Sequence, residues 1–161
     1  MKNLTKLLII FFTVSLFSFS PVYAAGSSGT DGADSGSLYK QGKKLVYKAK
    51  KLEKKNKEEK AKKLYLKALV KFEKAYDKDK KNADILNYLG FSLRKTGNLE
   101  KAEIYYLKGL KLDAAHLGIN EYLGELYLQT NRIELAKERL EVLSSCKCEE
   151  YEELKALIEN K

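Results

Sequence analysis

Apolar residues in the C-terminal half of the chain recur in a pattern that repeats itself. Residues 83–116 lie over residues 117–150 when they are shifted by 34 positions. Three pairs of equivalent positions carry the period: Leu89 and Leu123, Gly90 and Gly124, Ala102 and Ala136. Apolar spacing of three to four residues within each copy is typical of amphipathic helices. The pattern therefore predicts two copies of one helical hairpin.

Small residues stand where two helices of a hairpin would approach each other. Glycine inside a helix costs about 1 kcal/mol relative to alanine, so Gly90 and Gly124 need a packing reason. We predict that each allows the first helix to approach the second closely. Ala102 and Ala136 are the predicted small facing partners.

Turn-forming residues separate the two predicted helices of each copy. Gly97 can adopt the left-handed conformation that ends the first helix, and Asn98 can cap the next one. Asn131 takes the place of Gly97 in the following copy, since asparagine tolerates that conformation better than most residues. Asn56 predicts a turn in phase with both.

These residues resemble the signature of the tetratricopeptide repeat. The matching positions are Leu86, Leu89-Gly90, Leu93, Ala102 and Tyr106. Two features depart from it: Leu86 and Asn120 replace the usual tryptophan, and Ala114 and Cys148 replace the usual proline. The resemblance implies an all-α fold, a TPR-type α-solenoid.

The preceding segment, about residues 42–82, predicts a first repeat with an alteration. Leu45, Ala49 and Leu52 recur at helical spacing, and Ala61, Tyr65 and Ala68 follow the pattern of a second helix. The set Ala68, Phe72 and Ala75 restates that pattern one heptad later. We therefore expect a second helix lengthened by about two turns, or roughly 10 Å.

One more amphipathic segment follows the third copy, at about residues 149–160. Its apolar face consists of Tyr151, Leu154, Leu157 and Ile158. Solenoids need a polar-backed end helix to cover the last repeat. The sequence thus predicts one domain, residues 38–161, of three hairpins (about 42–82, 83–116 and 117–150) and a capping helix.

The N-terminal segment does not belong to this domain. Lys2 and Lys6 precede an apolar run at residues 7–19, and a small-residue site ends at Ala24, which is typical of a cleaved signal peptide, residues 1–24. An uncleaved anchor is the weaker alternative, since a bilayer needs about 20 apolar residues. Residues 25–37 are rich in Gly and Ser and predict a flexible linker. We expect an exported, periplasmic protein.

Charge is divided unevenly along the predicted domain. Residues 38–82 contain 18 lysines and six acidic residues, whereas residues 83–161 contain 11 basic and 14 acidic residues. The simplest interpretation is that the lysines of residues 38–82 lie on solvent-exposed faces of the helices. Two others remain: weak contact of the basic first repeat with an anionic envelope surface, and self-association with the acidic end of another copy. Nucleic acid is not an expected partner.

The resemblance also implies a binding groove on the concave face of the first helices. Tyr47, Tyr88 and Tyr122 form a predicted tyrosine row at spacings of 41 and 34 residues. Tyrosine combines broad apolar contact with a hydroxyl group that can bond a peptide backbone. The groove set is Tyr47, Lys50, Asn87, Tyr88, Phe91, Arg94, Glu121, Tyr122 and Glu125.

The ligand of this groove is expected to be a peptide segment or helix of a partner protein. The carboxylate clamp of some co-chaperones of the family is not reproduced, because Val46 and Tyr88 occupy parts of it. Glu121 and Glu125 would also repel a carboxylate. Lys50 and Arg94 at one end and the glutamates at the other favour a ligand of mixed charge.

The only cysteines, Cys146 and Cys148, flank one lysine. An oxidising compartment favours a disulfide between them, provided that the segment bends. The cysteine pair has three interpretations: a structural disulfide, a redox-active pair or a soft-metal site. Two thiolates with His116 as the one available imidazole are too few for a closed zinc site.

No catalytic constellation is evident elsewhere. His116 lies at a repeat junction without a recognisable triad partner, and packing or surface exposure is its expected role. Phosphate-binding glycine loops and metal-ligand spacings are not found. The leading hypothesis is a non-enzymatic periplasmic adaptor without a cofactor; the alternative is a redox or thiol accessory protein that uses the cysteine pair.

Overall fold

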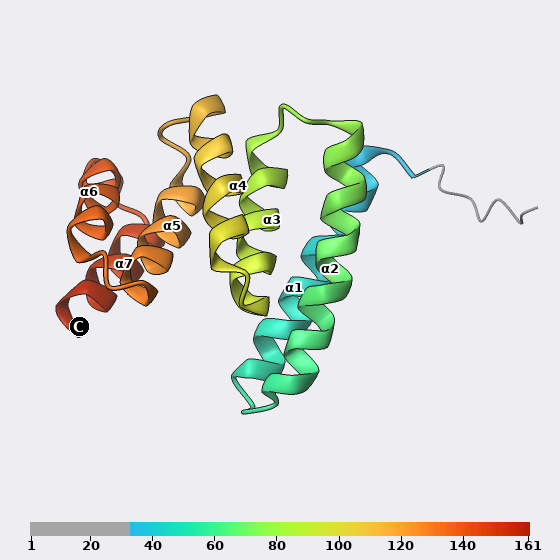
Figure 1. Ribbon diagram of the computed structural model, residues 1–161, viewed down its shortest axis with the longest axis horizontal. Coiled ribbons are helices and arrows are strands. Elements are labelled where there is room, and N and C mark those ends of the chain that lie inside the picture. The colour runs from blue at the N-terminus through green and yellow to red at the C-terminus, as the bar shows by residue number, and fades with distance from the viewer. Residues whose placement is uncertain (1–32) are drawn as a thin grey trace, which may run out of the picture. The chain divides into compact units, whose positions relative to one another are not determined.

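The computed structural model describes residues 33–161, so the predicted signal peptide and most of the predicted linker lie outside the described residues. Within them the chain forms seven α-helices and no strand. The helices are α1 (Ser35–Glu53), α2 (Glu58–Lys78), α3 (Ala83–Thr96), α4 (Leu99–Leu112), α5 (Leu117–Gln129), α6 (Ile133–Leu143) and α7 (Glu149–Glu159) (Figure 1). None of these helices is long and apolar enough to cross a bilayer.

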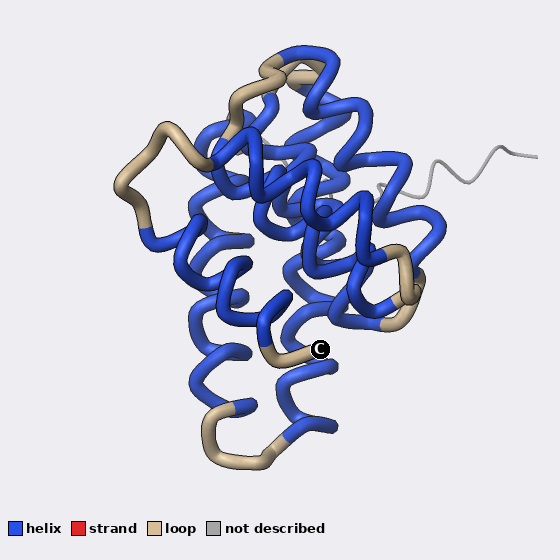
Figure 2. The backbone as a smooth tube through the Cα atoms, turned by 90° about the vertical axis from the view of Figure 1, so that its left-hand side faces the viewer, coloured by secondary structure: helices blue, strands red, loops and turns tan. Residues whose placement is uncertain are grey.

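The helices stack in sequence order as antiparallel hairpins. α1 packs on α2, α3 on α4, and α5 on α6, while α2–α3 and α4–α5 contacts join successive hairpins (Figure 1). The first helices also meet one another, α1 with α3 and α3 with α5. Short loops connect the helices (Figure 2). The predicted architecture, an all-α stack of three hairpins with a C-terminal capping helix, is confirmed.

α1 begins at Ser35, inside the stretch predicted as linker. The side chain of Asp34 accepts a hydrogen bond from the Ser37 amide at 2.7 Å, which caps the helix. Ser35 Oγ also donates to the carbonyl of Ala75 in α2 at 3.1 Å. These two bonds hold the first turn of α1 in place three residues before the predicted start.

The turns between paired helices follow the sequence prediction. Gly97, Asn131 and Asn56 have φ values of 95°, 57° and 54°, all in the left-handed region. Asn98 caps α4 by accepting a hydrogen bond from the Lys101 amide at 3.2 Å. Left-handed residues end the first helices because they turn the chain away from the helix axis without requiring a long loop.

Both helices of the first hairpin are lengthened. α1 has 19 residues and α2 has 21, whereas α3 and α4 have 14 each. The prediction of a long second helix is therefore incomplete, because α1 is extended to match it. The α1–α2 turn extends past the α3–α4 turn in Figure 1.

Glycines fix the register of the hairpins. A Cβ atom on Gly90 would lie 2.5 Å from the ring of Tyr106 in α4, and one on Gly42 would lie 2.5 Å from the ring of Phe72 in α2. Gly42 and Phe72 are thus the counterparts of Gly90 and Tyr106. A Cβ on Gly124 would lie 2.5 Å from Leu154.

Gly90 therefore has its predicted role, whereas the prediction for Gly124 is wrong in its partner. Leu154 belongs to α7 and not to α6, the second helix of that hairpin. α7 packs on both α5 and α6, and Leu154 is fully buried. The close approach at Gly124 thus docks the capping helix.

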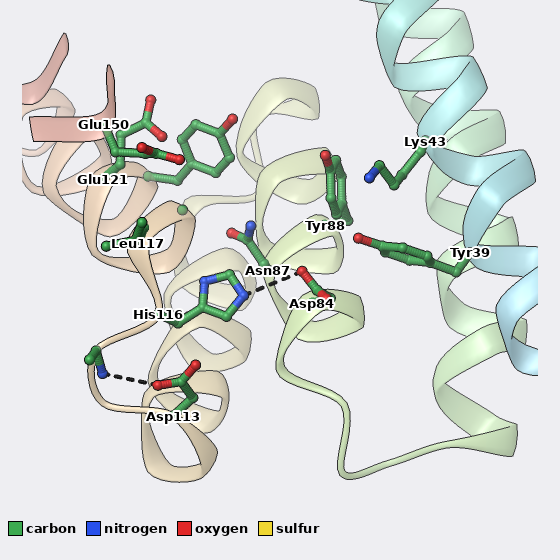
Figure 3. A pocket seen from close by; sticks show the side chains of 13 residues that line it. Tyr39, Lys43, Asp84, Asn87, Tyr88, Asp113, His116, Leu117, Glu121 and Glu150 are labelled. Carbon is green, nitrogen blue, oxygen red and sulfur yellow. Dashed lines mark hydrogen bonds and ion pairs between the residues drawn. The ribbon is translucent and has the colours of Figure 1, made fainter. Parts of the chain in front are cut away.

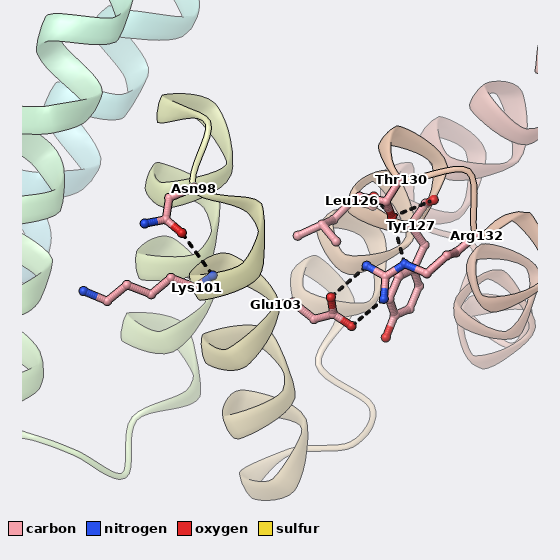
Figure 4. Close-up of polar contacts among 7 residues, drawn as sticks. All are labelled: Asn98, Lys101, Glu103, Leu126, Tyr127, Thr130 and Arg132. Carbon is pink, nitrogen blue, oxygen red and sulfur yellow. Dashed lines mark hydrogen bonds and ion pairs between the residues drawn. The ribbon is translucent and has the colours of Figure 1, made fainter.

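A bidentate ion pair joins α4 to the turn before α6. The two terminal nitrogens of the Arg132 guanidinium donate to the Glu103 carboxylate at 2.8 and 2.7 Å (Figure 4). Arg132 Nε donates to Thr130 Oγ1 at 2.8 Å, and the guanidinium carbon lies 4.5 Å from the centre of the Tyr127 ring. A planar guanidinium suits this arrangement, since it can bond a carboxylate and stack at once.

Candidate functional site

A pocket of about 410 Å³ lies where α1, α3, α5 and the first turn of α7 converge. Figure 3 shows side chains from these elements pointing toward one another across it. The lining residues are Tyr39, Lys43, Asp84, Asn87, Tyr88, Asp113, Ala115, His116, Leu117, Gly118, Glu121, Tyr122 and Glu150. We call this space the concave pocket, because the first helices of the three hairpins form its wall.

Five aromatic rings form a continuous row along the concave pocket, and three of them line it. Tyr88 stacks on Phe72 with ring centres 5.2 Å apart and meets the edge of Tyr39 at 5.6 Å. On the other side, Tyr88 lies 6.4 Å from Phe91, which lies 4.8 Å from Tyr122. Such ring contacts are individually worth about 1 kcal/mol, so together they hold the three tyrosines in fixed positions.

Lysines from α1 lie over this aromatic row. Lys43 Nζ is 5.2 Å from the ring centre of Tyr39 and 5.7 Å from that of Tyr88. Lys50 Nζ is 5.1 Å from the ring centre of Phe91 and donates to the hydroxyl of Tyr122 at 3.3 Å. Both ammonium groups therefore combine exposure to solvent with cation–π contact.

The tyrosine hydroxyls remain protonated. Burial first, and then the negative charge of Asp84, raises the pKa of Tyr39 and of Tyr88. Burial and Glu121 raise the pKa of Tyr122 in the same way. Each tyrosine of the pocket thus keeps a hydroxyl group that can both donate and accept a hydrogen bond.

A second, smaller recess of about 140 Å³ adjoins the pocket beside α7. Its lining is Lys50, Glu121, Tyr122, Glu149, Glu150 and Glu153. Burial raises the pKa of Glu121 to about 9, and a hydrogen bond with Glu153 and the charge of Glu125 act in the same direction. Glu121 therefore keeps its proton at neutral pH and donates it in the hydrogen bond to Glu153.

His116 joins α3 to α5 at the edge of the pocket. Its Nδ1 accepts a hydrogen bond from the Ile119 amide at 3.2 Å and so caps α5. Its Nε2 lies 3.4 Å from Asp84 Oδ1 (Figure 3). His116 thus holds the N-terminus of α5 against the first turn of α3.

Four residues of the predicted groove set are buried. Phe91 is 2% exposed, and Arg94, Asn87 and Glu121 are likewise covered by their neighbours. Tyr88 and Tyr122 are half-buried and line the concave pocket, and Lys50 lines the smaller recess. Asn87 and Glu121 line the concave pocket although they are buried, whereas Phe91 and Arg94 lie outside its lining and support it.

Arg94 is a supporting residue. Its Nη1 atom lies 2.7 Å from Glu125 Oε2, and the Arg94 side chain is only 3% exposed. Burial lowers the pKa of Arg94, but Tyr106 and Glu125 outweigh burial and raise it above its ordinary value. The pair thus joins α3 to α5 beneath the rings of Phe91 and Tyr122.

Tyr47 does not belong to the tyrosine row. It is 60% exposed, its ring lies 4.4 Å from Lys51 Nζ, and it lines neither the pocket nor the recess. Tyr47 follows Gly42 by five positions, whereas Tyr88 precedes Gly90 by two. The predicted equivalence of Tyr47 and Tyr88 is therefore wrong by one heptad, because it leaves out the extension of α1.

Sequence reasoning missed several residues of the pocket. Tyr39 and Lys43 come from the early part of α1, and Asp84, His116 and Glu150 come from helix N-termini or from the turn before α5. The signal that could have found the first two is Gly42. Alignment of Gly42 with Gly90 places Tyr39 at the position of Asn87 and Lys43 at that of Phe91.

Cys146 and Cys148 are joined by a disulfide in the turn between α6 and α7, with Cα atoms 5.2 Å apart. The bend that closes it includes a hydrogen bond from the Cys146 amide to the carbonyl of Leu143. Among residues 33–161, no group of three or more His, Cys, Asp or Glu side chains is arranged to hold a metal ion.

The fold and the pocket define an α-helical repeat protein whose first helices present an open, tyrosine-lined site. Residues 83–116 match the family model of the tetratricopeptide repeat. The predicted resemblance to this family is thereby confirmed, and α3 and α4 form the matching repeat. No curated protein sequence matches this chain.

One solved structure shares the fold. The type III secretion translocator chaperone SycD of Yersinia enterocolitica is 19% identical, with a TM-score of 0.54, and the match covers 80% of this chain and 92% of that chain. A complex of SycD with a peptide of the translocator YopD is 21% identical, with a TM-score of 0.48, and the match covers 73% and 86% of the two chains. At such identities the similarity shows the fold alone.

Proposed function

We propose that this protein is a non-enzymatic adaptor that binds a peptide segment or helix of a partner protein in the concave pocket. The observation that carries the proposal is the row of Tyr39, Tyr88 and Tyr122, which is fixed by ring packing and open on one side. Fixed tyrosines lose little conformational entropy on binding and offer both an apolar ring and a hydroxyl group. With so few anchors, micromolar affinity is expected, or about −8 kcal/mol.

A library of randomised nonapeptides panned on the purified protein tests this proposal. Enriched peptides should bind wild type and lose at least about tenfold in affinity with the Tyr88→Ala/Tyr122→Ala variant, since each ring supplies a binding contact. Tyr47→Ala is the matched control, because Tyr47 is exposed and outside the pocket. Circular dichroism of every variant checks that the fold is intact.

Two results would reject the adaptor proposal. One is a full library screen that yields no peptide with micromolar affinity. The other is a set of enriched peptides whose binding is unchanged by Tyr88→Ala/Tyr122→Ala.

We further propose that the adaptor acts in the periplasm after removal of residues 1–24. The support is the sequence pattern alone: two lysines, an apolar run and a small-residue site that ends at Ala24. N-terminal sequencing of the protein from a periplasmic extract should begin at Ala25. An intact Met1 in the cytosolic fraction would contradict this location.

A further inference from the structure

Polar groups in the concave pocket are mostly hydrogen-bond acceptors with negative charge. Three carboxylates line it, against the one ammonium group of Lys43: Asp84, Asp113 and Glu150. Lys43 already lies over the rings of Tyr39 and Tyr88. The excess of acceptors indicates a ligand that brings donors and positive charge.

Two of the carboxylates lie in first turns of helices, Asp84 in α3 and Glu150 in α7. A helix N-terminus carries a partial charge of about +0.5, which offsets only part of a carboxylate. Glu121 on α5 also lines the pocket, but it holds its proton at neutral pH and adds only an uncharged carboxyl group. The negative potential of the pocket therefore persists after the helix dipoles are counted.

Asn87 supplies an independent observation. It lines the same pocket, is 5% exposed, and its Oδ1 atom is buried without a hydrogen-bond partner. Gly118 leaves the space for this carboxamide, because a Cβ atom there would lie 2.8 Å from Asn87 Nδ2. A buried acceptor without a partner costs about 1–3 kcal/mol, and a donor from a ligand would remove that cost.

We infer that the concave pocket selects a peptide that carries a lysine or arginine, whose cationic group lies between Asp84, Glu121 and Glu150 and donates to Asn87. This inference rests on the proposed function and adds the chemistry of the partner to it. The aromatic row binds the apolar stem of the same side chain, since lysine and arginine stems pack readily on rings. The site is thus opposite in charge to a carboxylate clamp.

The panned nonapeptides test the inference separately from the proposed function. Each enriched peptide is resynthesised with its Lys and Arg residues replaced by norleucine or by Glu. We expect norleucine to weaken binding about tenfold and Glu to weaken it further, because two or three partly exposed charge contacts are lost or reversed. The difference should shrink at 0.5 M salt, where the Debye length is about 4 Å.

Variants of the protein locate the effect. The Asp84→Asn/Glu150→Gln variant should bind Lys-containing peptides about three- to tenfold more weakly than wild type does. Its affinity for the norleucine peptides should be unchanged. Glu134→Gln/Glu138→Gln removes the same charge from exposed positions on α6 and serves as the matched control. Asn87→Leu keeps the side-chain volume but removes the acceptor, and should also weaken the Lys-containing peptides.

The two proposals fail in different ways. Peptides that depend on Tyr88 and Tyr122 but bind equally well with norleucine or Glu would overturn the inference and leave the adaptor function standing. An equal loss in both double charge variants would also overturn it, since the effect would then come from net charge and not from the pocket. If no peptide depends on the tyrosines, the proposed function itself fails.

Discussion

Replacement of Arg94 by alanine is expected to lower the free energy of unfolding by about 3 kcal/mol. The Arg94 side chain is 3% exposed, and its guanidinium lies 2.7 Å from the Glu125 carboxylate and 5.6 Å from the centre of the Phe91 ring. Removal of one partner leaves the other charge without compensation in a partly desolvated site. Glu125 retains 22% exposure, which places the expected cost at the lower end for buried pairs. Urea denaturation followed by circular dichroism measures it.

A paired substitution separates charge from packing. Arg94→Met/Glu125→Gln keeps most of the volume and removes both charges, so it should be at least about 1 kcal/mol more stable than Arg94→Met alone. Lys137→Ala is the control for an exposed pair, because Lys137 and Glu134 lie 2.8 Å apart in solvent on α6. That change should cost at most about 0.5 kcal/mol. Equal losses for Arg94→Ala and Lys137→Ala would contradict a structural role for the buried pair.

Stability is expected to fall as the pH rises from 5 to 8.5, and Glu121 is the cause. Its pKa is raised from 4.5 to about 9, first by burial and then by Glu153 and Glu125. A group with a raised pKa holds its proton more tightly in the folded state. Its stabilising contribution is therefore fully present below pH 4.5 and is lost as the pH approaches 9. One proton limits the slope to about 1.4 kcal/mol per pH unit.

Glu121→Gln tests this dependence, because glutamine stays neutral and still donates a hydrogen bond to Glu153. The variant should equal or exceed wild type in stability at pH 8.5, and its stability should change less between pH 5 and 8.5. The charged groups around this site are Lys50 of α1, Glu125 of α5 and Glu149, Glu150 and Glu153 of α7. Glu134→Gln, on the exposed face of α6, controls for net charge. Parallel stability curves for wild type and Glu121→Gln would contradict the prediction.

The second and third hairpins could be predicted because the 34-residue spacing of their equivalent residues allows only one alignment. Leu89-Gly90 and Ala102 recur 34 residues later, and the turns at Gly97 and Asn131 adopt the expected conformation. The first hairpin allowed two registers, since Ala61-Tyr65 and Ala68-Phe72 repeat the same pattern one heptad apart. The contact between Gly42 and Phe72 shows which of the two registers the structure adopts.

The site was less predictable because the exposure of a groove residue depends on side chains from the neighbouring helices. A periodic pattern places Phe91 and Asn87 on the face that lines a groove, but it does not show that side chains from α1 and α5 cover them. Both are buried in the structure. His116 illustrates the reverse case: its role as a cap and as a contact of Asp84 depends on the meeting of two helix N-termini. Such a meeting leaves no local sequence pattern.

The extended tip of the first hairpin, the α1–α2 turn, is held in a fixed position relative to the other hairpins. Tyr65 Oη donates to Glu53 at 2.8 Å across the two long helices, and Glu53 also binds Lys95 at the end of α3 at 2.8 Å. These bonds hold the tip against the rest of the helix stack, so it is a rigid projection and not a flexible one. A partner held beside Lys43 would therefore have to follow α1 for roughly 16 Å to reach the lysines of this tip, at residues 54–57.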